Sequence, residues 1–239
     1  MSREKVFRFK QFQVVNDKAA MKVGTDGVLL GAWCNVAGAR RVLDVGTGCG
    51  VIALMVAQRN SEAQIDAVEI DKDSADEAAL NFSRSPWTDR LHVEHVDFND
   101  FATHAGVGVY DLIVSNPPFF TNGILPPEAS RMSARHTRNL TYGQLLNNAG
   151  KLLADGGKIA LITPFDNVKE IIEESVFNKL SIRKKVNIIS VNGLPPKRVL
   201  WELVKFPSPM HESELVIEAS PGVFSDEYIA LCKDFYLKM

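Results

Sequence analysis

Short apolar runs alternate with amphipathic stretches through the middle of this chain, and the alternation predicts strands and helices in turn. The runs are rich in valine, isoleucine and leucine, and each is stopped by glycine, aspartate or proline. Strands that alternate with helices indicate a doubly wound α/β fold, with a mostly parallel sheet and helices on both faces. We expect strands at 41–45, 64–70, 91–96 and 112–114, and helices at 51–60 and 72–84.

The two ends of the chain carry weaker patterns of the same kind. Apolar residues at 7, 9, 12 and 14 alternate with polar ones and predict a hairpin-like appendage over 1–23. An apolar helical segment at 24–38 should pack on the central strands and helices, and we expect a single domain over 1–239 because no repeat or linker divides it. After residue 140 we expect helices at 142–153, 167–180 and 226–237, and strands at 158–163, 182–191 and 199–206.

Composition indicates a soluble protein that works in the cytoplasm. The 239 residues are 46% hydrophobic and 23% charged, which is ordinary for a globular domain with a well-filled core. The apolar runs are too short to span a bilayer and the charged N-terminus lacks a signal core, so we expect no membrane association. Three widely spaced cysteines argue against a disulfide framework or a four-ligand zinc site, and we expect no metal.

Charge is divided along the chain, although the net charge is only −2. Residues 61–100 hold eleven acids and three bases, whereas residues 179–205 hold seven bases and one acid. Residues 1–22 hold six bases and two acids. A nucleic acid could approach the basic segments if folding gathers them on one side, and separate solvated faces are the alternative.

A glycine-rich turn follows the first of the central strands and carries the strongest local signal in the chain. Gly46, Gly48 and Gly50 let the backbone approach a ligand closely, and the helix behind them presents unpaired N–H groups. Their spacing differs from the Gly-x-Gly-x-x-Gly of dinucleotide-binding folds, which disfavours a pyrophosphate. With Asp44 beside it, the loop suits a ligand with a positive end, and a plain βα turn without a ligand is the alternative.

Acidic residues end the next two strands. Glu69 and Asp71 lie about twenty residues beyond the glycines, as a carboxylate that accepts both hydroxyls of a ribose should. Asp97 could accept an adenine amino proton, and Phe98 could lie against the ring. Two structural alternatives stay open: Asp71 can be a helix N-cap, and Asp97 can be a turn residue.

The fourth strand ends abruptly at Asn116-Pro117-Pro118. Neither proline has an N–H, so the corner offers carbonyl acceptors beside one Asn amide, and an amino group would suit it. Phe119 adds an aromatic face on which a flat ring with an exocyclic amine could stack. The alternative is that the two prolines simply end a core strand.

Residues 121–139 come after this corner and show no helical or strand period. Loops of this length in a compact domain are commonly functional or mobile. Arg131, Arg135 and Arg138 could bind phosphate or stack on bases, because guanidinium groups are planar and always charged. An ordinary solvated loop is the alternative.

Together these motifs have a specific order and spacing. The segment 44–50, Glu69, Asp97 and the segment 116–119 resemble the Rossmann-like class I methyltransferases, which use S-adenosylmethionine and methylate exocyclic amines. The resemblance implies a sheet of seven strands whose last strand is antiparallel. It also implies a cofactor site of Asp44, Gly46, Gly48, Gly50, Glu69, Asp97, Phe98 and Asn116, and a catalytic corner of Asn116, Pro117, Pro118 and Phe119.

A closer resemblance covers nearly the full length of the chain. The segments 9–12, 21–33 and 134–136 are similar to the bacterial tRNA adenine-N6 methyltransferases that modify the adenine just 3′ of the anticodon of a valine tRNA. In that family the Gly-Thr-Asp-Gly segment closes over the methionine part of the cofactor, which implies roles for Thr25 and Asp26 and a position for 24–38 near the cofactor. The resemblance implies a tRNA substrate. We expect no obligate protein partner, in addition to the absence of membrane association inferred above. The expected RNA contacts are Arg131, Arg135, Arg138, Lys197 and Arg198.

Other acceptors stay open, because Asn-Pro-Pro-Phe also occurs in guanine-N2 ribosomal RNA methyltransferases. Protein glutamine-N5 methyltransferases typically carry Asn-Pro-Pro-Tyr, from which Phe119 departs. A different class of answer is a module that keeps the cofactor fold and holds RNA without catalysis. The intact corner at 116–119 argues against that module, because a non-catalytic descendant needs no site for an amine.

Overall fold

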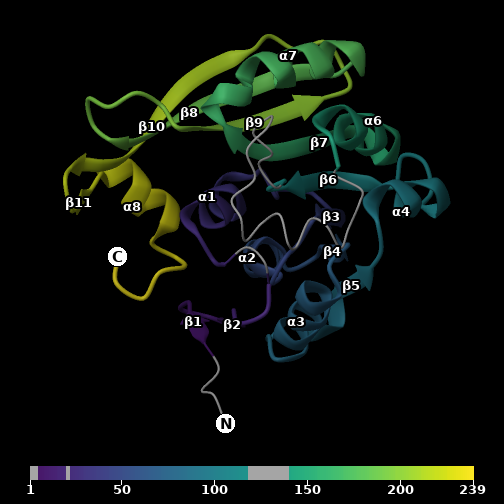
Figure 1. The fold of residues 1–239 in the computed structure, drawn as a ribbon, viewed down its shortest axis with the longest axis horizontal. Helices are drawn as coiled ribbons and strands as arrows, with labels where there is room; N and C mark the ends of the chain where they lie inside the picture. Colours follow the sequence, from purple (N-terminus) through teal and green to yellow (C-terminus); the bar gives the residue numbers. More distant parts are fainter. Residues whose placement is uncertain (1–4, 20–21, 118–139) are drawn as a thin grey trace, which may run out of the picture.

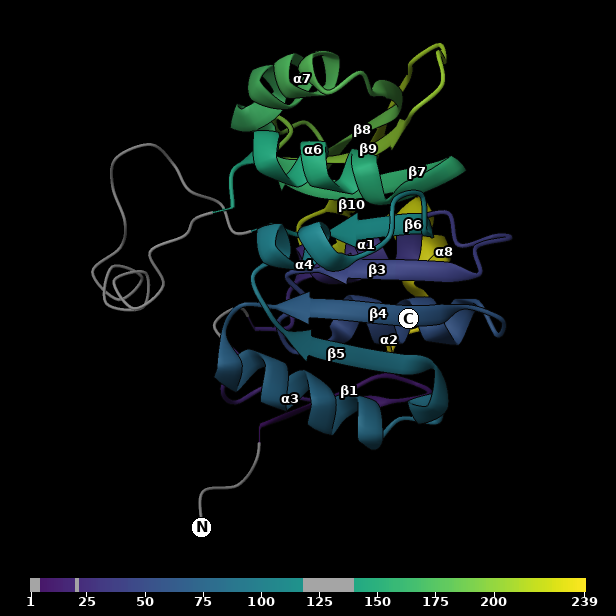
Figure 2. The same cartoon turned by 90° about the vertical axis from the view of Figure 1, so that its right-hand side faces the viewer.

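One large sheet forms the centre of the molecule in the computed structural model, which describes residues 5–19, 22–117 and 140–239. Its strands are β3 (Arg41–Val45), β4 (Gln64–Glu69), β5 (Leu91–His95), β6 (Tyr110–Ser115), β7 (Leu153–Pro164), β8 (Ser181–Val191), β9 (Arg198–Val204), β10 (His211–Ser220) and β11 (Val223–Phe224). Their order across the sheet is β11-β10-β8-β9-β7-β6-β3-β4-β5, and Figure 2 shows β7, β6, β3, β4 and β5 one below another. These five strands pair in parallel, whereas β9 is antiparallel to both of its neighbours.

Helices cover both faces of this sheet (Figure 1). One face carries α1 (Thr25–Trp33), α2 (Val51–Arg59), α3 (Lys72–Ser83) and α8 (Asp226–Cys232), whose buried residues share one hydrophobic cluster. The other face carries α4 (Phe98–His104), α6 (Tyr142–Leu152) and α7 (Val168–Phe177), whose buried residues share a second cluster. Two 3-10 turns, η1 (Thr88–Arg90) and η2 (Phe165–Asn167), complete the set of helices in the described residues. The predicted doubly wound fold with helices on both faces is confirmed.

Side chains that alternate along the strands supply both hydrophobic clusters. Val42 and Leu43 are adjacent and fully buried in β3, yet Val42 belongs to the first cluster and Leu43 to the second. In β6, Val114 faces the first cluster and Ile113 the second. Strands that are buried on both faces form continuous apolar runs, which is why the sequence predicts these central strands well.

The sheet has more strands than the seven expected. β3 to β9 are those seven, and β9, the last of them, is antiparallel as predicted, but β10 and β11 extend the sheet beyond β8. β10 was missed because only Leu215 of its ten residues is buried, so its sequence carries little apolar signal. The helix α4 was also missed, and α8 ends at Cys232, earlier than the predicted residue 237.

The predicted N-terminal hairpin forms from β1 (Val6–Arg8) and β2 (Gln13–Val15). Phe9 and Phe12, which lie between the two strands, are buried, and their stacked rings are 4.5 Å apart at the centroids. The Lys10 N–H donates to the Phe235 carbonyl at 2.8 Å. The hairpin therefore packs beside the C-terminal segment, as Figure 1 also shows.

Two side chains of α3 hold the segment at the end of this hairpin. The buried Asn81 amide accepts the Val15 N–H at 2.7 Å and donates to the carbonyls of Val15 and Cys49, both at 2.9 Å. The Glu77 carboxylate, 3% exposed, accepts the backbone N–H groups of residues 17, 18 and 19 at 2.8, 2.7 and 3.1 Å. Because Cys49 lies in the glycine-rich loop, Asn81 connects the N-terminal segment to that loop.

Replacement of Asn81 by alanine is expected to lower the free energy of unfolding by about 2–4 kcal/mol, because buried backbone groups of Val15 and Cys49 lose their partner. Denaturant unfolding measures the difference. The matched control is Asn147→Ala on the exposed face of α6, which should stay within about 0.5 kcal/mol of the parent. An Asn81→Ala protein as stable as that control would contradict the stabilising role of the hydrogen bonds from Asn81 to Val15 and Cys49.

Candidate functional site

Four parallel strands bring predicted site residues to one edge of the sheet. β3 leads into the glycine-rich loop 46–50, β4 ends at Glu69, β5 is followed by Asp97, and β6 by Asn116. β3 lies between β4 and β6, so the chain winds away from it in both directions. Doubly wound sheets bind ligands at such a switch point, outside the carboxyl ends of the strands.

Asp44 lies at the centre of this edge and is fully buried. Its Oδ2 accepts the Thr47 hydroxyl at 2.6 Å and the Ala53 N–H at 3.2 Å. Its Oδ1 is buried and accepts no hydrogen bond from any residue that the structure describes. Burial raises the pKa of this carboxyl to about 7, and the negative charge of Glu69 adds to the increase. The site therefore holds a buried acceptor that a cationic or N–H-bearing ligand would satisfy.

The glycines of the loop are required by its backbone. Gly46, Gly48 and Gly50 have φ angles of +70°, +56° and +84°, in the left-handed region. A Cβ on Gly50 would lie 2.5 Å from a ring carbon of Phe82, so this position also needs the small residue for packing. A Cβ on Gly46 or Gly48 would meet nothing within 4 Å, which means that open space lies beside the loop.

Glu69 holds this loop against the end of β4. Its Oε2 accepts the Gly48 N–H at 2.8 Å and its Oε1 accepts the Asp71 N–H at 2.9 Å. Burial raises the pKa of the carboxyl. Because a carboxylate has about four acceptor positions, Glu69 keeps capacity for ligand hydroxyls. Asp71 accepts the Ser74 N–H at 2.9 Å as the N-cap of α3, so the structural alternative for that residue is confirmed.

Asp97 and Phe98 start α4 at the next strand end. Asp97 is the N-cap of this helix and accepts the Asn99 N–H at 2.7 Å. Phe98 is 5% exposed and belongs to the same hydrophobic cluster as Val45 and Val68. Phe98 therefore packs beneath the strand ends, and Asp97 is the more accessible of the two for a ligand.

Asn116 stands directly after β6, beside the glycine-rich loop of the neighbouring strand. The Ser115 hydroxyl donates to the Val45 carbonyl at 2.8 Å, which ties the ends of β6 and β3 together. The Asn116 Oδ1 atom is buried and accepts no hydrogen bond within the described part of the chain. A buried amide oxygen without a donor is costly, so this atom is placed to accept an N–H from a ligand.

The start of α1 lies beside the start of α2, which follows the glycine-rich loop: a Cβ on Gly27 would be 3.4 Å from a methyl carbon of Val51. Asp26 accepts the Arg198 Nε–H at 2.8 Å, while Thr25 is exposed in the first helical turn. Arg198, which was predicted to contact RNA, thus forms an ion pair with a predicted cofactor residue. Lys197 beside it is exposed. Outside the described residues are Pro118, Phe119, Arg131, Arg135 and Arg138.

Two residues of the site were not singled out from the sequence. Thr47 occupies a variable position of the Gly-x-Gly-x-Gly pattern, yet its hydroxyl donates to Asp44. Asn81 lies in the middle of an amphipathic helix, and nothing local distinguishes it from a surface residue. The sequence held one signal that could have identified Thr47, namely a hydroxyl side chain inside the glycine-rich loop.

Residues 5–19, 22–117 and 140–239 contain neither a membrane-spanning helix nor a cluster of metal-binding side chains. No helix within these ranges is long and apolar enough to cross a membrane. The same ranges contain no group of three or more His, Cys, Asp or Glu side chains that could hold a metal ion.

The family model and the curated proteins that this chain resembles are all methyltransferases. The family model of the methyltransferase small domain matches residues 18–191. A curated protein of Trichodesmium erythraeum named tRNA1(Val) (adenine(37)-N6)-methyltransferase is 46% identical over 234 residues, which are 97% of this chain and 98% of that protein. A protein of the same name from Tolumonas auensis is 41% identical over 235 residues, which are 98% of this chain and 97% of that protein.

Solved structures agree at the level of the fold. A predicted O-methyltransferase from Agrobacterium tumefaciens has a TM-score of 0.71 at 18% identity, covering 88% of this chain and 96% of that one. Pyrococcus horikoshii TYW2, solved in complex with MeSAdo, has a TM-score of 0.58 at 16% identity, covering 85% of this chain and 72% of that one. Both structures share the α/β fold of this chain.

Proposed function

Because the chain belongs to the tRNA1(Val) (adenine(37)-N6)-methyltransferase family, we propose that it methylates the N6 amino group of the adenine immediately 3′ of the anticodon in a valine tRNA. The methyl donor would be S-adenosylmethionine. The observation that carries the proposal is the buried, unpartnered Oδ1 of Asn116 at the strand end next to the glycine-rich loop. An exocyclic amine brings the N–H donor that this oxygen lacks.

The residues at the strand ends fit S-adenosylmethionine. Asp44 offers a buried acceptor without a partner, which suits the positive end of that molecule. Gly46 and Gly48 leave open space for the ligand, and Glu69 can accept ribose hydroxyls. Asp97, Phe98, Thr25 and Asp26 remain the proposed contacts to the adenine and methionine parts. When bound, the cofactor supplies a methyl group on a sulfonium, which an amine can attack.

Asn116 and Pro117 hold the acceptor amine in our proposal. The adenine amine is a weak nucleophile because its lone pair is delocalised into the ring, so catalysis depends mainly on positioning. If Asn116 Oδ1 and the Pro117 carbonyl accept its two N–H groups, the nitrogen can pyramidalise and direct its lone pair away from the ring. Phe119 would stack on the base, and the surplus proton leaves the methylated nitrogen for water. No strong base is required.

The adenine must leave the stack of the anticodon loop to reach this corner. Enzymes that act on bases extrude them at a cost of a few kcal/mol, and the cost is smallest where the base is already unpaired. An anticodon loop meets that condition. We propose that the reaction takes place in the cytoplasm on tRNA alone, without an obligate protein partner.

Cofactor affinity is expected to rise with pH through about 7, because the ionised form of Asp44 attracts the positive end of the cofactor. Burial raises the pKa of Asp44 in the folded protein, so the neutral form prevails below pH 7 and the weaker-binding state becomes populated. The apparent Kd should be roughly tenfold higher at pH 6 than at pH 7.5. Isothermal titration calorimetry measures it, and Asp44→Asn should bind weakly at both pH values. A parent protein with equal affinity at both would contradict the role of Asp44.

Transfer of labelled methyl groups to separated acceptors tests the proposed function. Purified protein is incubated with labelled S-adenosylmethionine and, in parallel, with tRNA, ribosomal RNA or a soluble protein extract. We expect label in tRNA. Label in ribosomal RNA or in protein glutamine would favour the guanine-N2 or glutamine-N5 reaction instead, and RNA binding without label would favour a non-catalytic module.

A further inference from the structure

A cavity of about 770 Å³ opens on the side of the molecule where the two ends of the chain meet. This lateral cavity is open to solvent and is lined by the N-terminal hairpin, the start of α1, residues of β8, β9, β10 and β11, and α8 with the segment after it. Its volume lies within the roughly 300–1,000 Å³ of ordinary ligand pockets. It contains none of the proposed contacts of the methyl donor except Thr25 and Asp26.

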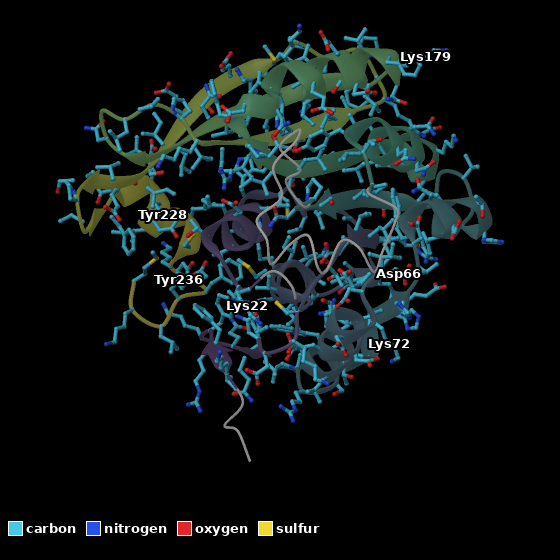
Figure 3. The ribbon with its side chains drawn as sticks, viewed as in Figure 1. Lys22, Asp66, Lys72, Lys179, Tyr228 and Tyr236 are labelled. Carbon is cyan, nitrogen blue, oxygen red and sulfur yellow. The ribbon has the colours of Figure 1, made fainter. Side chains whose placement is uncertain are left out.

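Aromatic side chains form one wall of the lateral cavity. Tyr228 and Tyr236, which Figure 3 shows near one another, contribute to it together with Phe7 and Phe224. The rings form two contacting pairs: Phe224 and Tyr228 are 5.1 Å apart at the centroids, and Phe7 and Tyr236 are 6.2 Å apart. Such a wall offers π-faces to an inserted flat ring, and stacking on aromatic side chains is how single-stranded RNA bases are commonly held.

Positive side chains also line the lateral cavity. Arg8, Lys197 and Lys238 are exposed, and none of them forms an ion pair with another residue in the described ranges. The two lining carboxylates are already engaged, since Asp26 accepts from Arg198 and Glu218 accepts the Gly222 N–H at 2.9 Å. Three available cations beside aromatic faces favour a ligand that combines phosphates with planar rings.

The register of the sheet puts this cavity beside the acceptor corner. Ser115 at the end of β6 pairs with Leu161 of β7, and the register continues along β7 to Pro164, which pairs with Arg198 of β9. With strands about 4.8 Å apart and about 3.3 Å of rise per residue, the backbones of Asn116 and Arg198 are roughly 10–15 Å apart. A single RNA strand covers that distance in a few nucleotides, at about 3.4 Å of rise for each stacked nucleotide.

We infer that the lateral cavity binds a second, non-reacting nucleotide of the anticodon region of tRNA, with its base against the aromatic wall and its phosphates between Arg8, Lys197 and Lys238. This assignment rests on the proposed function. It would give the enzyme a second contact with the same RNA strand whose adenine enters at Asn116. The N-terminal hairpin and the C-terminal segment, which lie side by side, thereby acquire a common role in substrate binding.

The double variant Arg8→Ala/Lys197→Ala tests the phosphate contacts. Fluorescence anisotropy with labelled tRNA should give an affinity about tenfold below that of the parent, and the slope of log Kd against log salt should fall by about 1.5, since each lost contact removes roughly 0.7–0.9. The matched control is Lys169→Ala/Lys179→Ala in and after α7, two exposed lysines outside the cavity, with Lys179 shown far from the tyrosines in Figure 3. The control should retain both affinity and slope.

Ser190→Trp tests whether the cavity itself is occupied. Ser190 lines the lateral cavity from β8, and a tryptophan there would occupy part of it without changing charge. We expect the KM for tRNA to rise at least fivefold while the Kd for S-adenosylmethionine and the melting temperature stay unchanged. Ser213→Trp on the exposed part of β10 is the matched control and should behave like the parent.

The outcomes separate this assignment from the proposed function. If the parent protein methylates tRNA while the double variant and Ser190→Trp bind tRNA as the parent does, the cavity assignment is wrong and the proposed function stands. If the parent neither binds nor methylates tRNA, the proposed function fails and the assignment fails with it. Selective loss of tRNA affinity in both variants, with cofactor binding intact, supports the assignment.

Discussion

Asn116→Ala is expected to reduce the rate of methyl transfer to tRNA by about 10²–10³-fold, comparable to the loss of one preorganised hydrogen-bonding group from another active site. The physical reason is the position of the Asn116 Oδ1 atom, which is buried at the end of β6 without a donor among the described residues. Removing it takes away the oxygen that, in our proposal, accepts an N–H of the amine in the transition state. The affinity for S-adenosylmethionine should remain nearly unchanged, because Asp44, Glu69 and the glycine-rich loop stay in place.

Single-turnover kinetics with tRNA and calorimetry with S-adenosylmethionine measure the two quantities separately. Asn116→Asp is the matched variant, because it keeps an acceptor oxygen of similar size at the same position and should retain more activity than the alanine variant. Asn116→Ala with parental turnover would contradict the catalytic corner. A large loss of cofactor affinity in Asn116→Ala would instead assign the residue mainly to the cofactor.

Glu69→Ala and Asp44→Asn are expected to weaken S-adenosylmethionine binding by about 30- to 700-fold, which corresponds to about 2–4 kcal/mol for a charged hydrogen-bonding group in a desolvated site. In our proposal Glu69 has two roles, because it binds the cofactor and its carboxylate also accepts the Gly48 N–H at 2.8 Å, which keeps the loop in position. Asp44→Asn keeps the size of a fully buried side chain, so its effect reports on charge and not on a cavity.

Calorimetric titration measures both variants against Glu62→Ala, whose side chain is exposed before β4 and should have no effect on cofactor affinity. Thermal unfolding of the free proteins verifies that the variants are folded. Parental affinity in Glu69→Ala and Asp44→Asn together would show that the strand ends are not the cofactor site.

The central fold could be predicted from the sequence because its signals are local. β3 and β6 are buried on both faces and consist mainly of apolar residues, and the glycines of the loop occupy left-handed backbone positions that other residues rarely adopt. The acids and the Asn-Pro-Pro corner lie at or just after the ends of strands, so strand prediction also placed them at one sheet edge. Only the three-dimensional structure shows that one oxygen of Asp44 and the amide oxygen of Asn116 are buried without a hydrogen-bond partner among the described residues.

Other features depend on contacts between distant parts of the chain, and the sequence could not reveal them. β10 has one buried residue and acquires strand structure by pairing with β8. Asn81 is informative only because Val15, 66 residues earlier, lies against it. The pairing of Arg198 with Asp26 joins residues 172 positions apart, so the sequence did not show that this arginine, predicted to contact RNA, also has a partner within the protein.

The most direct test of the proposed function is to locate the methyl group in the product. Unmodified valine tRNA is incubated with the protein and S-adenosylmethionine, cleaved into defined fragments and examined by mass spectrometry of fragments and nucleosides. The proposal predicts one additional methyl group, recovered as N6-methyladenosine, in the fragment that carries the adenine immediately 3′ of the anticodon. A methyl group on guanine, on another adenine, or on no nucleotide of this tRNA would contradict it.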